Sequence, residues 1–229
     1  MKNKSFFVTL KNRGLIHIEG KDRYEFLQGL ITNDIKKLSP QTSLYACLLN
    51  AQGKFLHDFF IIEGDGFILL DCEGGERAQD LYKRLNMYRL RADVQISIEE
   101  ENDVYAIFGR DEGLPDPRHP EMGNRSFEKP DLEERPFEEW DKRRITLTIP
   151  DGSRDLVVEK STMDEASMDQ INAIDYDKGC YVGQELTARM HYRGLGKRKL
   201  QTVNLDALPE KADLRSSCKD IGIALVKIQ

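Results

Sequence analysis

Apolar and polar residues alternate in short runs along the first hundred positions, and this period of two predicts β-strands. Turns that contain glycine or asparagine separate the runs, most clearly at residues 12–14, 52–53 and 64–66. We expect two strands within residues 6–20, three within 43–72, and one each within 92–100 and 103–109.

Two stretches between these strands have the period of a helix instead. Asp22 is placed to cap the first helix, and Glu25, three residues later, completes a capping box. The second helix, in residues 76–90, carries Leu81, Leu85 and Tyr88 on one side. Strands and helices in this order predict antiparallel sheets covered by helices, which is the α+β class.

The alternation stops after residue 108. Residues 111–141 hold five of the eight prolines, and eleven acidic residues against four lysines and arginines. This composition is typical of a surface segment rather than of a buried strand or helix. We therefore interpret residues 109–141 as an acidic, proline-rich excursion or linker.

Regular patterns return in the last third of the chain. Residues 143–150 predict a strand, and residues 161–174 predict a short helix, capped by Ser161 or Thr162 with Glu165 behind it. The C-terminus adds two or three strands. The predicted parts are two halves of one α+β domain, residues 1–108 and 142–196, the excursion at 109–141, and a short C-terminal β segment at 197–229.

The composition is that of a soluble globular protein, with 39% hydrophobic and 32% charged residues. No apolar run is long enough to span a membrane, and the N-terminal run is too short for a secretory signal, so we expect a cytoplasmic protein. The net charge of −6 disfavours nucleic acid as a general partner. Residues 187–200 nevertheless contain five lysines and arginines and no acid, which indicates a local anionic partner.

The four cysteines, Cys47, Cys72, Cys180 and Cys218, are widely spaced. The chain has no C-x-x-C motif, so we expect neither a zinc site nor a stable iron–sulfur cage, and no metal ligands are assigned. A disulfide framework is not expected without an export signal.

The stretch KGCYVGQE places Cys180 in a crowded turn. Gly179 and Gly183 allow backbone conformations or close approaches that other residues cannot adopt. Good helix formers follow Gly183, so Cys180 is expected just before a helix N-terminus, with Lys178 nearby. Both the helix dipole and the ammonium group favour the thiolate form, which suits nucleophilic, redox or soft-metal chemistry.

The helix that follows carries more polar groups. Gln184 and Glu185 fall in its first turn, where they can cap it or bind a ligand, and Arg189 and Arg193 offer planar donors to a carboxylate or phosphate. A simpler interpretation is also open: Cys180 is a small residue fitted into a turn, Glu185 complements the helix dipole, and the arginines form a solvated face. The residues alone do not decide between these.

Three stretches resemble a known family. KGCYVGQE resembles the signature of the YgfZ-type folate-binding proteins, which include mitochondrial maturation factors for [4Fe–4S] proteins. LQGLITNDIKKL and LLNAQGKFLHDFFI also match the family pattern, and LTARMHYRGLGKRKL looks closest to its mitochondrial-type and alphaproteobacterial branch. The family is similar in fold to the T-protein of glycine cleavage, a tetrahydrofolate-dependent aminomethyltransferase. The C-terminal segment of this chain is shorter than the usual small β-barrel.

The resemblance implies a tetrahydrofolate-like ligand in a central cleft. Asp58 matches the essential acid of the T-protein, Tyr45 a tyrosine that contacts folate, and Asp71 an asparagine on the next strand, while His57 replaces an acid. Thr146 falls where the T-protein has the glutamate that holds the pterin, and it cannot make the same paired contact. An alternative for Asp58 is a buried acid bonded to the backbone at a strand end.

The favoured hypothesis is therefore a folate-binding accessory factor for assembly or repair of [4Fe–4S] proteins, with Cys180 as a transient ligand or redox group. A single cysteine cannot hold a [4Fe–4S] cluster, so assembly proteins or client apoproteins are the implied partners. The second hypothesis is a tetrahydrofolate-dependent one-carbon transferase that uses Asp58. The third, which the net charge disfavours, is a module that binds tRNA or another anion through its basic segment.

Overall fold

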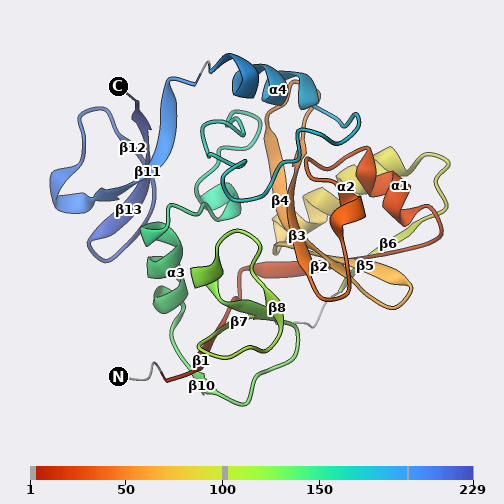
Figure 1. The fold of residues 1–229 in the computed structure, drawn as a ribbon, viewed down its shortest axis with the longest axis horizontal. Coiled ribbons are helices and arrows are strands. Elements are labelled where there is room, and N and C mark those ends of the chain that lie inside the picture. Colours follow the sequence, from red (N-terminus) through yellow and green to blue (C-terminus); the bar gives the residue numbers. More distant parts are fainter. Residues whose placement is uncertain (1–3, 100–102, 195, 229) are drawn as a thin grey trace.

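Three β-sheets form the framework of the protein, and helices lie against them (Figure 1). The computed structural model describes residues 4–99, 103–194 and 196–228. Nearly all neighbouring strands are antiparallel, and the exception is the pairing of β1 with β10. The predicted α+β class with antiparallel sheets is thereby confirmed.

The N-terminal half contains a five-stranded sheet in the order β3-β4-β5-β2-β6. All of its strands come from the runs of alternating residues in the first hundred positions. They are β2 (Arg13–Glu19), β3 (Ser43–Leu49), β4 (Phe55–Glu63), β5 (Phe67–Glu73) and β6 (Gln95–Glu99). The strands β3, β4 and β5 are almost wholly buried, because side chains pack against both faces of the sheet.

Two helices cover one face of this sheet. They are α1 (Arg23–Gln28) and α2 (Glu76–Arg89), and Leu81 and Leu85 of α2 are fully buried. The predicted capping box at the start of α1 is wrong, because the side chain of Asp22 makes no capping hydrogen bond. Its carboxylate instead accepts the backbone N–H of Asp93 (2.8 Å), which ties α1 to the loop that leads into β6.

A second five-stranded sheet, in the order β10-β1-β7-β9-β8, contains much of the acidic, proline-rich segment. Its strands are β1 (Phe6–Thr9), β7 (Tyr105–Phe108), β8 (Leu114–Pro115), β9 (Asn124–Ser126) and β10 (Glu133–Glu134), and a 3₁₀ turn, η2 (Pro120–Met122), joins β8 to β9. The segment 109–141 is thus not an irregular linker: it contributes strands to a sheet, although most of its residues are exposed or half-buried as the composition suggested. Asp116, Arg118 and Arg125 are buried, and they are tolerated there because opposite charges lie in contact.

Residues 137–150 differ from the expectation as well. The predicted strand at 143–150 is wrong, because α3 (Phe137–Thr146) occupies its first half. Acidic residues in the first turn of α3 and arginines in its last turn complement the helix dipole, and this pattern outweighs the local alternation.

The predicted helix in residues 161–174 is also absent, and the chain forms successive turns there. The capping pair nevertheless forms: the N–H of Thr162 donates to Glu165 Oε2 (2.9 Å), and the N–H of Glu165 donates to Thr162 Oγ1 (3.2 Å). A capping box thus closes a turn here without starting a helix.

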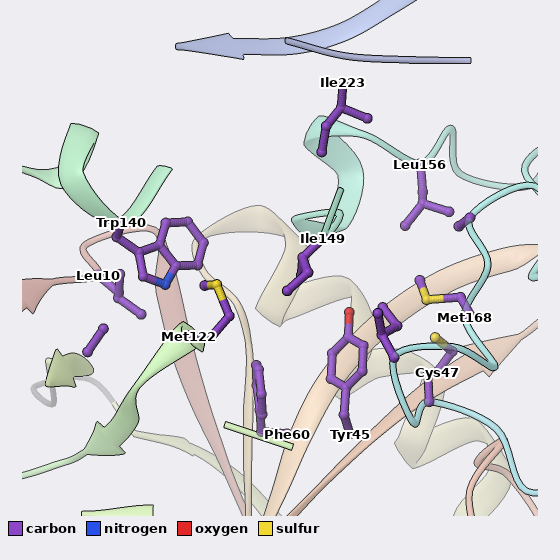
Figure 2. Packing of buried hydrophobic residues seen from close by; sticks show 14 of the residues in the cluster. Leu10, Tyr45, Cys47, Phe60, Met122, Trp140, Ile149, Leu156, Met168 and Ile223 are labelled. Carbon is purple, nitrogen blue, oxygen red and sulfur yellow. The ribbon is translucent and has the colours of Figure 1, made fainter. Parts of the chain in front are cut away.

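The C-terminal segment forms a three-stranded antiparallel sheet in the order β11-β13-β12, which lies beside α3 (Figure 1). Its strands are β11 (Arg198–Asn204), β12 (Asp213–Cys218) and β13 (Ile221–Lys227). Figure 2 shows the interior that this sheet shares with the other two, where Trp140 and Met122 lie near Phe60 and Tyr45, and Ile223 enters from β13. The remaining helix, α4 (Gln184–Arg193), begins beside the turn between β3 and β4.

Candidate functional site

The structure places the predicted site residues in two different surroundings. Tyr45, Asp58 and Asp71 lie together in the interior, on the adjacent strands β3, β4 and β5. The KGCYVGQE residues and the two arginines of α4 lie in a surface turn and the helix after it. These surface residues are Lys178, Gly179, Cys180, Gly183, Gln184, Glu185, Arg189 and Arg193.

The interior group is built around a hydrogen bond between Tyr45 and Asp58. Tyr45 pairs with Phe60 across β3 and β4, and Asp58, two residues from Phe60, therefore projects to the same face. The Tyr45 hydroxyl donates to Asp58 Oδ2 over 2.6 Å. Burial raises the pKa of the Asp58 carboxyl, against the opposing effects of Arg13 and of this hydrogen bond.

Three arginines enclose the other side of this group. Arg13 and Arg125 each donate through Nε to Asp71, at 2.6 and 2.8 Å. Arg118 makes two hydrogen bonds to Asp116, at 3.0 and 2.8 Å. The three guanidinium carbons lie 5.6, 3.7 and 4.7 Å from the centre of the Phe60 ring, for Arg13, Arg125 and Arg118 respectively. Cations at these distances are attracted by the face of an aromatic ring.

This arrangement does not fit a pterin ring. Tyr45, Asp58 and Asp71 are each no more than 2% exposed, and their polar groups bind one another or the arginines. Arg118 also lies over the Tyr45 ring, 5.2 Å from its centre. An acid that acts on folate must be reached by the substrate, and in this chain Asp58 lies beneath the protein's own side chains.

Two further residues compared with the T-protein lie outside this group. Thr146 ends α3 on the surface, and its hydroxyl donates to the carbonyl of Lys142 (2.8 Å). His57 faces α2, where its Nε2 lies 2.8 Å from Asp80 Oδ2. Burial and the nearby Arg77 lower the pKa of His57 to about 4, so the imidazole is neutral at pH 7.

The arginines and their partner Asp116 were missed in the sequence. Most of their contacts join residues more than fifty positions apart, as between Arg13 and Asp71, and no local pattern reveals such pairs. The one local signal is the Asp-Pro-Arg spacing of residues 116–118, which places a carboxylate and a guanidinium two residues apart in a rigid turn.

The filled interior generates a prediction for folate. We expect no saturable binding when the protein is titrated with tetrahydrofolate up to about 1 mM in a calorimeter, because binding would require the buried ion pairs to separate. Asp58→Asn should behave in the same way. Saturable binding with a dissociation constant of about 10 µM or below that Asp58→Asn removes would contradict this description of the interior.

The surface turn is fixed by Lys178. Its ammonium group donates to three backbone carbonyls, those of Gln28 (2.9 Å), Ile31 (2.6 Å) and Asn33 (2.7 Å). These carbonyls lie at and just after the C-terminal end of α1, where a helix leaves its acceptors unsatisfied. Burial lowers the pKa of Lys178 to about 8, and the acidic side chain of Asp34 opposes this shift. Lys178 thus binds the backbone of another segment, whereas the sequence suggested that it would act on the thiol.

Other contacts hold the two sides of the same turn. The N–H of Asp175 donates to the carbonyl of Thr32 (3.0 Å), and the N–H of Val182 donates to that of Gly29 (3.1 Å). The carboxylate of Asp175 also pairs with Lys37 at 2.7 Å. Cys180 lies between these anchors and is exposed.

The two glycines of the turn differ. Gly183 has a φ of 82°, and a Cβ there would lie 2.5 Å from the carbonyl oxygen of Asn50, so glycine is required. Gly179 has no positive φ, and a Cβ there would meet no atom within 4 Å. The special conformation and close approach that the sequence allowed at both glycines are thus used at Gly183 and not at Gly179.

The polar residues of α4 are largely engaged with the helix itself. Gln184 Oε1 accepts the N–H of Tyr181 (3.2 Å), and Glu185 forms an ion pair with Arg189 on the surface. Arg193 makes no ion pair with any residue that the structure describes. His191 stacks on Tyr176, with 3.8 Å between the ring centres.

Replacing Lys178 tests the anchoring of the turn. In Lys178→Met the apolar stem remains but the carbonyls lose their donor, and we expect the free energy of unfolding in urea to fall by about 2 kcal/mol. Arginine should not restore it, because a planar guanidinium cannot converge on three carbonyls in this way. Lys36→Met, at an exposed position without an ion pair in the described chain, should change stability by less than about 0.5 kcal/mol. Wild-type stability of Lys178→Met would show that the anchor is not needed.

Comparison with solved structures defines the class of fold. The chain resembles the crystal structure of the glycine cleavage system aminomethyltransferase T from Bartonella henselae, with a TM-score of 0.64 and 15% sequence identity, over 98% of this chain and 78% of that one. The likeness establishes an aminomethyltransferase-T-like fold, as the sequence predicted. No family model matches the chain.

Curated relatives give the family. The chain is 32% identical to the human iron-sulfur cluster assembly factor IBA57, mitochondrial, over 87% of its own length and 67% of that protein. It is 34% identical to the IBA57 homologue of Pyricularia oryzae, of whose length it spans 60%. The chain therefore belongs to the IBA57 family of iron–sulfur cluster assembly factors, a YgfZ-like family.

The same relatives correct the predicted location. Each is named as a mitochondrial protein, which overturns the expectation of a cytoplasmic one. Within the described ranges, no helix has the length and apolar character needed to cross a bilayer.

Proposed function

We propose that this chain assists the assembly or repair of [4Fe–4S] proteins, and that Cys180 is a transient ligand for a cluster in transit. Membership of the IBA57 family supports the process, and the exposure of Cys180 supports the residue. The cluster is the cargo of this activity and belongs to the partner proteins before and after transfer.

The observation that carries the proposal is the contrast between Cys180 and the other cysteines. Cys47, Cys72 and Cys218 are buried, and burial raises the pKa of each of these thiols. Cys180 alone is exposed. Iron binds the thiolate form of a cysteine that it can reach, so Cys180 is the one thiol of this chain suited to the task.

Partner proteins must complete the coordination of the cluster. A [4Fe–4S] cluster takes four thiolates, and one chain offers a single exposed thiol. The described residues also contain no group of three or more histidine, cysteine, aspartate or glutamate side chains that could hold a metal ion. The remaining ligands therefore come from an assembly protein or from the client apoprotein.

The residues around Cys180 take positioning roles in this proposal. Lys178 and Gly183 fix the two ends of the turn, and a fixed turn presents the sulfur without the cost of ordering a loop during each encounter. Arg193, with no ion pair among the described residues, is free to engage an acidic surface of the partner.

Replacement of Cys180 tests the proposal. In cells that lack their native copy, Cys180→Ala should restore the activity of [4Fe–4S] enzymes to less than about a tenth of the wild-type level, as expected when a ligand is lost. Cys180→Ser should be equally poor, because a hydroxyl is a much weaker ligand for iron. The activity of a [2Fe–2S] enzyme serves as the internal comparison.

Gly179→Ala is the matched control, since the added methyl group meets only open space. It should rescue fully at the same protein level. Full rescue by Cys180→Ala would remove the thiol from the mechanism.

A further inference from the structure

An apolar patch lies at the C-terminal end of α2, on a part of the molecule that the proposed function does not use. Met87, Tyr88 and Leu90 are 66%, 38% and 88% exposed. Large apolar side chains that gather on a surface mark interaction sites more often than isolated ones do. Tyrosine, methionine and arginine, which occur together in residues 87–91, are also enriched at protein interfaces.

The backbone at Leu90 is strained. Leu90 ends α2 with a φ of 43° and a ψ of −104°, a conformation that favours glycine. A leucine in this conformation, with most of its side chain in water, contributes little to the stability of the monomer. Strain of this kind tends to persist at sites of function, where the side chain has a task outside its own chain.

A hollow lies directly beside this projecting side chain. It has a volume of about 390 Å³, and it lies between α1 and the loop that follows α2. Phe26 and Leu30 supply apolar surface on the α1 side, and Leu90 forms part of the opposite wall. The patch therefore contains both a projecting apolar side chain and a hollow for one.

Charges of opposite sign lie on the two sides of the hollow. Glu25 is on the α1 side, and Arg89 and Arg91 are on the side of Leu90. All three are exposed, and none forms an ion pair with another residue in the part of the chain that the structure describes. The Leu90 side of the hollow is therefore basic, and the α1 side is acidic.

We propose that this patch is a self-association surface, at which a second copy of the chain docks through two-fold symmetry. The symmetry axis places Leu90 of each copy in the hollow of the other, and it brings Arg91 of each copy opposite Glu25 of its partner. A two-fold interface uses the same surface twice and must be complementary to itself. A projection, an adjacent hollow and opposite charges on the two sides meet that requirement.

Other occupants fit the patch less well. A membrane would accept the apolar side chains and the arginines, but Glu25 and Asp22 on the same hollow would face anionic headgroups. An unrelated acidic protein would satisfy the arginines and leave Glu25 unmatched. The patch is small compared with a standard interface of about 20–30 residues a side, so the association is weak, with a dissociation constant of roughly 100 µM.

Sedimentation equilibrium of the full chain tests the proposal. Between about 10 µM and about 1 mM, the apparent mass should rise from the monomer value of 26.4 kDa toward twice that value. Leu90→Gly removes the projection and relieves the strain, so the monomer stays folded. We expect it to weaken association by roughly 100-fold, since each dimer loses two buried leucines.

A charge exchange then identifies the pairing. Glu25→Arg and Arg91→Glu should each weaken association by roughly tenfold, and the double variant should restore it, because in a symmetric dimer the exchanged charges meet again. Leu208→Gly, an exposed leucine in the C-terminal segment, should have no effect.

Three results would overturn the proposal. The first is a monomer at all concentrations, and the second is a dimer that survives Leu90→Gly. The third is a double charge variant that associates no better than the single ones. Binding of vesicles that contain phosphatidylserine, lost in Leu90→Gly while the protein stays monomeric, would assign the patch to a membrane surface instead.

Discussion

The structure depends on a buried set of ion pairs around Phe60. Asp71 of β5 binds Arg13 of β2 and Arg125 of β9, and so joins the two five-stranded sheets. Arg118 and Asp116 neutralise one another beside it. Removal of one member would leave a buried charge without its partner, a change that costs about 3–5 kcal/mol in proteins generally. These contacts therefore hold the two sheets together, and the removal of any one partner would lower the stability of the fold.

The same set of ion pairs fills the interior of a fold that resembles an aminomethyltransferase. Asp58, which the sequence comparison matched to the transferase acid, is buried and bonded to Tyr45. An interior filled by its own arginines gives the fold a rigid core, and a rigid core is a suitable support for a surface turn. The Cys180 turn is attached through Lys178 to the C-terminal end of α1, and its thiol is exposed while the interior is closed.

Local patterns in the sequence were sufficient for much of the fold. The strands β1 to β7, the helix α2 and the start of α4 after Gly183 follow from alternation, helical period and a glycine at a positive φ. The patterns failed where a distant partner decides the outcome. Residues 109–141 are rich in charge and proline, yet Arg118 and Arg125 are buried there because they find carboxylates and an aromatic ring in the fold. Likewise, the sequence placed Lys178 near Cys180 but could not show that its ammonium group reaches the end of α1.

The central claim is that one thiol is presented to partners while the interior stays closed, and the rates of cysteine alkylation measure it directly. Native protein is treated with iodoacetamide, and the modified positions are followed over time by mass spectrometry. We predict that Cys180 reacts at close to the rate of a cysteine in an unfolded peptide, and that Cys47, Cys72 and Cys218 react only when the protein unfolds. Protection of Cys180, or equally fast labelling of the three others, would contradict this account.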